Sequence, residues 1–256
     1  MVQAFPAIGC LGAGRAMDLK EENIIGDKIH DHWYYVSKGR AMRKFLGDMK
    51  IPEVLDVGAG SGIFSRQLMD EGLCDSAVCL DPNYPEERIE NHNGKRIHFV
   101  KTIEKSSQKL ILMMDVLEHV PDDVALLKQY VDSMEASGHV FITAPAFQFM
   151  WSGHDLFLGH YRRYTIKTIE AVVKKAGMIP VKSRYFFASL FPAIAAIRLC
   201  KKALLDRGAL KPQSELKLYP DWLNKALITV HDIERRTFFG LNKFFGLSLF
   251  CICRKN

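Results

Sequence analysis

The residues best suited to holding a ligand follow an acidic side chain. Beyond Asp56, glycines stand at every second position, at Gly58, Gly60 and Gly62, and a helix-like stretch begins at Ile63. Glycine adopts backbone conformations that other residues resist, and it lets a ligand approach the main chain. The first turn of the helix would offer unpaired N–H groups to an anion or carboxylate. The GxGxG spacing differs from the GxGxxG spacing of dinucleotide-binding folds.

Two further acidic residues close short apolar runs. Asp81 ends the run 78–80 and Asp115 ends the run 110–114. In a nucleotide-binding βαβ unit, a carboxylate about 20 residues beyond the glycines accepts hydrogen bonds from the ribose hydroxyls. Asp81 has that position, and all three acids are expected at the carboxyl ends of strands, where α/β sheets bind their ligands.

The elements that must position these residues alternate along the chain. Apolar runs and turn signals predict a parallel sheet with helices on both faces. The predicted strands are 53–58, 77–81, 97–100, 110–115 and 139–143, and the predicted helices are 62–71, 122–136 and 165–177.

These motifs resemble those of the class I S-adenosylmethionine-dependent methyltransferases. The stretch DVGAGSG, from Asp56 to Gly62, is similar to their first motif, and DVLEHV, residues 115–120, is similar to small-molecule methyltransferases of quinone synthesis. WSGHD…LGHYRRY, within 151–164, resembles a bacterial branch of the family. The resemblance covers roughly residues 50–180 and a final strand. It implies a doubly wound, mostly parallel, seven-stranded α/β sheet of the Rossmann-like methyltransferase type, with N-terminal helices and a helical insertion before an antiparallel last strand.

The resemblance also implies S-adenosylmethionine as the cofactor, and methyl transfer by in-line displacement to an oxygen or nitrogen of a small-molecule or lipid-linked acceptor. The glycine backbone would meet the amino-acid end of the cofactor, Asp81 the ribose, and Asp115 the neighbourhood of the methyl group. The implied cofactor-binding residues are Asp56, Gly58, Ala59, Gly60, Gly62, Asp81, Pro82, Thr102, Ile103, Asp115 and Val116.

Three histidines are candidates for the general base that methyl transfer needs if the acceptor must lose a proton. His119 follows the fourth predicted strand, and His154 and His160 lie in the segment 151–164. Histidine suits this role because its unperturbed pKa lies near 6.5. For each of them, packing and structural hydrogen bonding are the alternative interpretation.

The segment 151–164 is predicted to be a loop or short helix over the site, and it concentrates histidine, arginine and tyrosine. Arg162 or Arg163 would clamp a carboxylate or phosphate; the alternative is that they pair with Asp155 or with surface acids. We expect no metal, because the histidines and Asp155 lack a fourth ligand at a recognisable spacing. A helical lid at 29–49 would add aromatic faces for the sulfonium. The predicted substrate-binding residues are Tyr34, Tyr35, Arg40, Tyr161, Arg162, Arg163 and Tyr164.

The insertion 185–237 has two interpretations. Residues 185–197 are uncharged and mostly apolar, and basic residues follow as far as 207. The run is too short to span a bilayer, which takes about 20 residues. It is either a helical pair packed on the core or on a partner, or an element that lies on an anionic membrane surface through 185–207.

The remaining features indicate a cytoplasmic protein, and the second interpretation of 185–207 would place it at the periphery of the membrane. We expect a flexible leader at 1–20 and one methyltransferase domain at 21–256, ending in a strand at 246–253. Six cysteines without a CxxC pair fit a reducing compartment. The net charge is +6 without a basic tract of the nucleic-acid-binding kind. The competing functions are a nicotinamide-dependent oxidoreductase and a non-catalytic cofactor-binding subunit.

Overall fold

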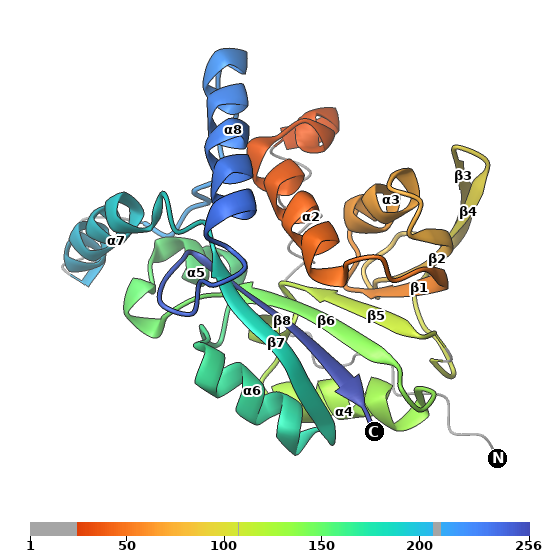
Figure 1. The fold of residues 1–256 in the computed structure, drawn as a ribbon. Coiled ribbons are helices and arrows are strands. Elements are labelled where there is room, and N and C mark those ends of the chain that lie inside the picture. The colour runs from red at the N-terminus through yellow and green to blue at the C-terminus, as the bar shows by residue number, and fades with distance from the viewer. Residues whose placement is uncertain (1–24, 107, 207–210) are drawn as a thin grey trace.

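The computed structural model describes residues 25–106, 108–206 and 211–256 (Figure 1). The predicted leader 1–20 lies outside the described residues. The described strands form one sheet of eight in the order β3-β4-β2-β1-β5-β6-β8-β7. They are β1 (Ile51–Val57), β2 (Cys74–Leu80), β3 (Arg88–His92), β4 (Lys95–Val100), β5 (Leu110–Met114), β6 (His139–Pro145), β7 (Met178–Phe186) and β8 (Ser248–Lys255).

Helices cover both faces of this sheet, as predicted. They are η1 (Gly26–His30), α2 (Trp33–Leu46), α3 (Ile63–Asp70), η2 (Leu117–His119), α4 (Asp123–Ser133), η3 (Gln148–Met150), α5 (Gly153–Leu158), α6 (Ile166–Lys175), α7 (Phe191–Asp206) and α8 (Asp221–Thr237). Helices α2 and α3 lie on one face, and α4 and α6 lie on the other (Figure 1). The doubly wound α/β fold is confirmed.

The central strands are apolar on both sides because both sides are covered. Val54 on β1 and Phe141 on β6 pack into the core under α2 and α3. Their chain neighbours Leu55 and Val140 pack into the second core, under α4 and α6. This alternation fixes the register of β1 and its parallel neighbours, because a slip of one residue would exchange the two faces.

The prediction of seven strands is wrong by one. Strand β3 pairs antiparallel with β4 and closes the edge of the sheet. Its residues alternate between exposed and half-buried, so it has no apolar run to mark it. The available signal was Asn93-Gly94, both at positive φ, which is the dipeptide preferred in two-residue hairpin turns.

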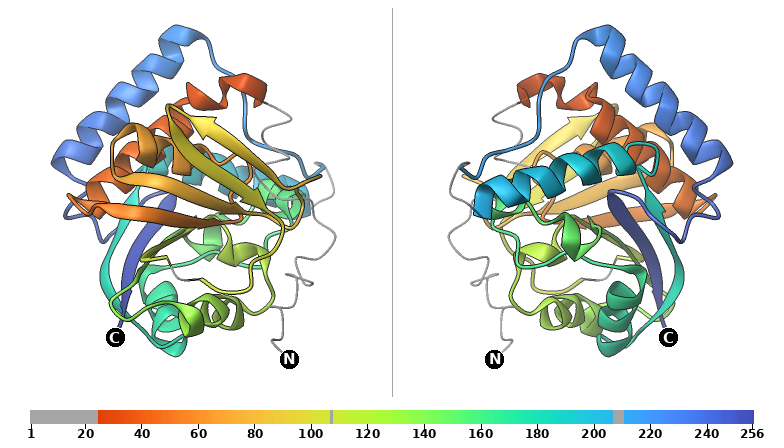
Figure 2. Two further views of the ribbon diagram at one scale, coloured as in Figure 1. Left: turned by 90° about the vertical axis from the view of Figure 1, so that its right-hand side faces the viewer. Right: turned by 90° about the vertical axis from the view of Figure 1, so that its left-hand side faces the viewer.

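The insertion begins later than predicted. Residues 185 and 186 end strand β7, and the two inserted helices are α7 and α8. Helix α8 runs beside α2 along the top of the molecule (Figure 2). The last strand, β8, lies antiparallel to both β6 and β7, as the resemblance implied. Among the described residues, we find no helix with the length and apolar character needed to cross a bilayer.

Candidate active site

The site lies where the winding of the sheet reverses. Strand β1 pairs in parallel with β2 on one side and with β5 on the other. The carboxyl ends of these three strands therefore meet at one edge of the sheet. In an open α/β sheet this is the position at which ligands bind. Gly58, Asp81 and Asp115 directly follow the three strands.

The glycine loop between β1 and α3 has a backbone conformation that requires glycine at three positions. Gly58, Gly60 and Gly62 have φ values of 69°, 52° and 72°, in the left-handed region that costs other residues steric strain. A Cβ atom on Gly58 would also stand 2.9 Å from Cγ2 of Val116. The loop therefore lies against the residues that follow β5, which brings two parts of the predicted cofactor site together.

Asp81 has one oxygen without a partner. Its carboxylate is buried, and Oδ1 accepts hydrogen bonds from the backbone N–H and side-chain Nδ2 of Asn83 at 2.9 and 3.0 Å. Oδ2 is buried and has no hydrogen-bond partner. Burial raises the pKa of Asp81 above its ordinary value. A ribose hydroxyl that donated to Oδ2 would satisfy this oxygen, so the residues present fit a nucleoside cofactor.

Asp56 lies beneath the glycine loop. Its carboxylate is buried and accepts a hydrogen bond of 2.8 Å from Ser65 Oγ on α3. Burial raises the pKa of Asp56 from 3.8 to about 7. The Asp56 side chain therefore links the end of β1 to helix α3.

We expect Asp56→Asn to flatten the pH dependence of stability. Because the folded-state pKa lies above the unfolded one, the folded protein keeps a proton between pH 4 and pH 7 that the unfolded chain has lost. The wild-type free energy of unfolding should fall through this window, by about 3 kcal/mol between pH 5 and pH 8 relative to the variant. Urea unfolding at both pH values measures this difference, and the exposed Asp75→Asn should behave like the wild type. Equal slopes for Asp56→Asn and wild type would contradict the expectation.

A buried ion pair joins α2 to the end of β5. Lys38 is fully buried, and its ammonium donates to Oδ2 of Asp115 and, at 3.0 Å, to the hydroxyl of Tyr34. Thr143 Oγ1 donates to Oδ1 of Asp115 at 3.0 Å. Burial by itself would raise the pKa of Asp115, but Lys38 keeps it below its ordinary value. Asp115 also has a φ of 56°, a strained conformation of the kind that clusters at functional sites.

A cavity of about 360 Å³ opens beside Asp115. Its polar residues are Asp115, Glu118, His154, His160, Arg163, Arg198, Glu215 and Ser248. Its apolar and aromatic residues are Trp33, Tyr34, Pro145, Leu158, Leu190, Ile194, Leu216, Tyr219, Leu223, Leu227 and Leu247. Most of these apolar residues come from α2, α7, α8 and the segment before α8, so the insertion forms much of the wall.

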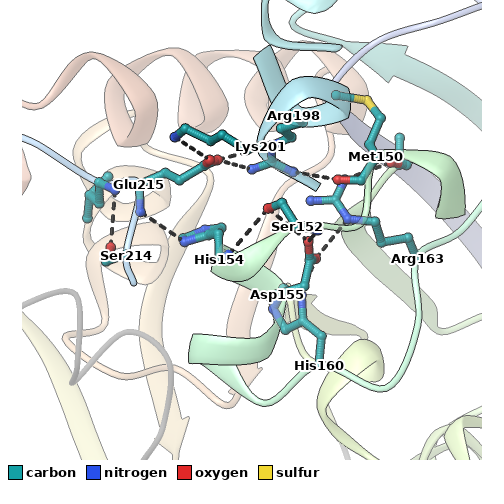
Figure 3. A network of polar contacts seen from close by, with 12 residues as sticks. Met150, Ser152, His154, Asp155, His160, Arg163, Arg198, Lys201, Ser214 and Glu215 are labelled. Atoms are coloured by element: carbon teal, nitrogen blue, oxygen red, sulfur yellow. Dashed lines mark hydrogen bonds and ion pairs between the residues drawn. The ribbon is translucent and has the colours of Figure 1, made fainter. Parts of the chain in front are cut away.

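A chain of polar contacts fixes the wall between α5 and α7 (Figure 3). Arg198 donates to Glu215 at 2.7 Å, and the backbone N–H of Glu215 donates to His154 Nδ1 at 3.1 Å. The carboxylate of Asp155 contacts His160 Nδ1 at 2.8 Å and Arg163 Nε at 2.7 Å. Burial lowers the pKa of His154 to about 4. His154 is therefore a neutral hydrogen-bond acceptor that is already engaged.

The predicted acceptor residues divide into two groups. Tyr34, Arg163, His154 and His160 line the cavity, and five others do not. Tyr35 and Tyr164 are buried in the core; Arg40 pairs with Asp232, Arg162 pairs with Asp123, and half of Tyr161 is exposed. For Arg162 the structure thus shows the alternative interpretation, a pairing with a surface acid.

The other predicted residues lie in different surroundings. Val116 contacts the glycine loop, as described above, and His119 lies beside His160, with ring centroids 4.6 Å apart. Beyond β4, Thr102 is exposed and Ile103 is half-buried against the second core.

Sequence reasoning missed Lys38, Glu118, Arg198 and Glu215. Glu118 stands next to His119 inside a motif that was recognised, which was the available signal. The others carry no local signal because their partners are distant in sequence, such as Asp115 for Lys38.

Comparisons with known proteins agree with this architecture. A family described as "Methyltransferase domain" matches residues 30–182. The chain therefore belongs to this family, and its membership favours methyl transfer over the nicotinamide-dependent alternative. A ubiquinone biosynthesis O-methyltransferase of Yersinia enterocolitica is 29% identical over 102 residues, which cover 36% of this chain and 41% of that enzyme. The match thus spans less than half the length of this curated relative.

Solved structures share the fold over most of the chain. A methyltransferase of Archaeoglobus fulgidus that depends on S-adenosylmethionine is 17% identical, with a TM-score of 0.51 over 93% of this chain and 98% of that one. A chain from a methyltransferase–activator complex of Haloferax volcanii is 14% identical, with a TM-score of 0.54 over 93% and 94% of the two chains. At these identities the likeness shows the fold alone.

Proposed function

We propose that the protein transfers a methyl group from S-adenosylmethionine to an oxygen or nitrogen of a small-molecule acceptor that carries a substantial apolar part. The observation that supports the cofactor is the unpartnered Oδ2 of Asp81 beside a glycine loop at the switch point of the sheet. The methyltransferase family match agrees with it, and the cavity beside Asp115 supplies room for the acceptor.

The chemistry asks the protein mainly for alignment. A sulfonium methyl group is already activated, so the site must place the acceptor atom in line with it and exclude water. The glycine loop and Asp81 would hold the cofactor, and Asp115 would border the methyl group. Lys38 and Tyr34 would keep the Asp115 carboxylate in place, because both bond it directly.

The cavity favours an amphiphilic acceptor. Leucine and isoleucine side chains from α7 and α8 form one side, and Glu118 and His160 stand among the polar residues. The apolar part of an acceptor would contact the inserted helices and its reacting heteroatom the polar residues. A lipid-linked acceptor whose reacting part is a single ring fits a cavity with one apolar side and one polar side. Of the two adjacent arginines, Arg162 and Arg163, only Arg163 lines the cavity. Its guanidinium already forms an ion pair with Asp155.

If the acceptor must lose a proton, His160 has the most suitable geometry of the three histidines. The Oδ1 atom of Asp155 lies 2.8 Å from Nδ1 of His160 and holds the ring in place. The other ring nitrogen of His160, Nε2, is buried without a hydrogen-bond partner. Such an arrangement holds one nitrogen and leaves the other to accept a proton. His154 is engaged with Glu215, as described above.

The direct test is transfer of an isotopically labelled methyl group to a panel of acceptors. We expect label in a hydroxylated or amino aromatic compound with an apolar tail, and less in its tail-less analogue. Asn in place of His160 should lower turnover while S-adenosylhomocysteine still binds. Cofactor binding without transfer to any acceptor would support the non-catalytic alternative, and absence of cofactor binding would refute the proposal.

We further propose that the protein meets an anionic membrane surface, through α8 and the residues that follow it. Trp222, Val230 and Ile233 are exposed at helical spacing on α8, and Leu241 and Phe244 are 75% and 72% exposed beyond its end. Exposed basic residues flank them, for example Lys225, Arg236 and Lys243. The first part of the predicted segment 185–207 is unsuited to this role, because residues 185–188 are buried in the core.

We expect the protein to sediment with liposomes of anionic lipid at low salt, and less at high salt. The double variant Trp222→Ser, Ile233→Ser should weaken this binding at least about tenfold, because two apolar side chains no longer enter the interface. Ile89→Ser, at an equally exposed position on β3, is the matched control. Absence of binding at low salt, or an equal effect of the control, would rule the surface out.

A further inference from the structure

Three ligand-type side chains converge at the polar side of the cavity. Glu118, His119 and His160 each bring one donor atom, and these atoms lie within 4.8 Å of one another. Glu118 and His119 end the short helix η2 after β5, and His160 follows α5. Two imidazoles and one carboxylate form the ligand set of many open transition-metal sites.

The second observation is a set of buried atoms without partners. Both carboxylate oxygens of Glu118 and Nε2 of His160 are buried and make no hydrogen bond. Glu118 is wholly inaccessible to solvent. A buried carboxyl group that makes no hydrogen bond through either oxygen is costly, and native structures rarely contain one. A bound cation would satisfy all three atoms.

The hydrogen-bond partners of His160 are those expected of a histidine that binds a metal. Asp155 contacts its Nδ1 at 2.8 Å, which fixes the ring and leaves Nε2 as the ligand atom. Histidines bound to metals nearly always have such a partner on the other nitrogen. Asp155 is itself held by Arg163 Nε at 2.7 Å and by the backbone N–H of Ser152 at 2.8 Å. His119 lies edge-on to His160, with the two rings at 81°.

We propose that Glu118, His119 and His160 bind one divalent transition-metal ion, best matched by Zn²⁺, with an open coordination position toward the cavity. Bonds of about 2.1 Å would bring the ligand atoms about 3.4 Å apart, so the side chains close slightly around the ion. Nearby charges are balanced: Asp115 is paired with Lys38, and Arg163 is paired with Asp155. Among the described residues, the salt bridges that are present do not include the Glu118 carboxylate, so its charge would be available to the ion.

A role for the ion in catalysis rests on the proposed function. Glu118 and His160 both line the cavity, so an oxygen of the acceptor would occupy the open position. A metal-bound hydroxyl group loses its proton more readily than a free one. Metal binding itself does not depend on this role and can be measured without methyl transfer.

The test is a calorimetric titration of the full chain, treated with chelator, with Zn²⁺. We expect saturable binding of about one equivalent and a rise in the melting temperature, because the ion binds the folded state. Glu118→Gln and His119→Ala should each weaken binding about 100-fold or more, and Asp155→Asn at least about tenfold. Mg²⁺ should bind far more weakly, because it prefers oxygen ligands.

Matched controls are Glu104→Gln and His98→Ala, both exposed and distant in the sequence from the cluster; they should bind Zn²⁺ as the wild type does. A cooperative unfolding transition in urea, measured for each variant without the ion, reports that it is folded. Absence of saturable Zn²⁺ binding by the wild type, or equal binding by site and control variants, would overturn the metal site and leave His160 as a base. Failure of S-adenosylhomocysteine binding with intact Zn²⁺ binding would overturn the proposed function and leave the metal site standing.

Discussion

Replacing Asp81 by alanine is expected to weaken S-adenosylhomocysteine binding about 100-fold, since hydrogen bonds to a charged acceptor contribute roughly 1.5 to 3 kcal/mol each. The unpartnered Oδ2 is available to a ribose hydroxyl, and Oδ1 already accepts from Asn83. The variant also removes the two bonds that hold Asn83. Isothermal calorimetry measures the change in affinity.

Two controls separate the ribose contact from a general disturbance. Asp75→Ala, at an exposed position on the strand that Asp81 follows, should bind as the wild type does. Asp81→Asn keeps the size of the side chain, and we expect it to lose part of the affinity because it has no charge. An unchanged affinity in Asp81→Ala would place the ribose elsewhere and would remove the main support for the cofactor site.

The second large effect concerns the stability of the fold at the site. We expect Asp115→Asn to lower the free energy of unfolding by about 3 kcal/mol, because it leaves the Lys38 ammonium buried without a counter-charge. Asparagine suits the change because it tolerates the positive φ of this position better than most residues. Unfolding in urea gives the difference.

A variant of Lys38, the other member of the ion pair, tests whether the loss of stability comes from the pair itself. Lys38→Met should destabilise less, because Asp115 keeps its bonds from Thr143 and Tyr34. The double variant should be more stable than Asp115→Asn alone, since the unpaired ammonium is gone. If the double variant were as unstable as the sum of the two single variants, the pair would not be coupled and the account of Lys38 would be wrong.

The cofactor side of the site was predictable because its chemistry lies on consecutive residues. A glycine loop, the strand before it and the acid that ends the next strand all appear as local patterns. The parallel sheet then brings Gly58, Asp81 and Asp115 to one edge without any further information. The same local logic failed for β3, whose side chains alternate between exposed and half-buried and therefore carry no apolar run.

The acceptor side was predictable only in part because it depends on long-range packing. Arg162 and Arg163 are adjacent, yet one pairs with Asp123 at the surface and the other is buried with Asp155. No periodicity in this loop distinguishes them. Lys38 resembles any lysine of an amphipathic helix until the fold places it against Asp115, 77 positions away.

The inserted helices illustrate the same limit. The apolar composition of 185–237 predicted either burial or an interface, and the structure places its apolar residues in three different environments. Residues 185–188 are core, Ile194 and Leu227 line the cavity, and Trp222 is exposed. Composition cannot separate these environments, because each of them accepts the same apolar side chains.

The central claim is that the glycine loop and Asp81 hold S-adenosylmethionine. The most direct measurement is a calorimetric titration of the wild-type protein with S-adenosylhomocysteine, beside an identical titration with NAD. We expect saturable binding of S-adenosylhomocysteine and no binding of NAD at the same concentrations. Binding of NAD in preference to S-adenosylhomocysteine, or of neither, would contradict it.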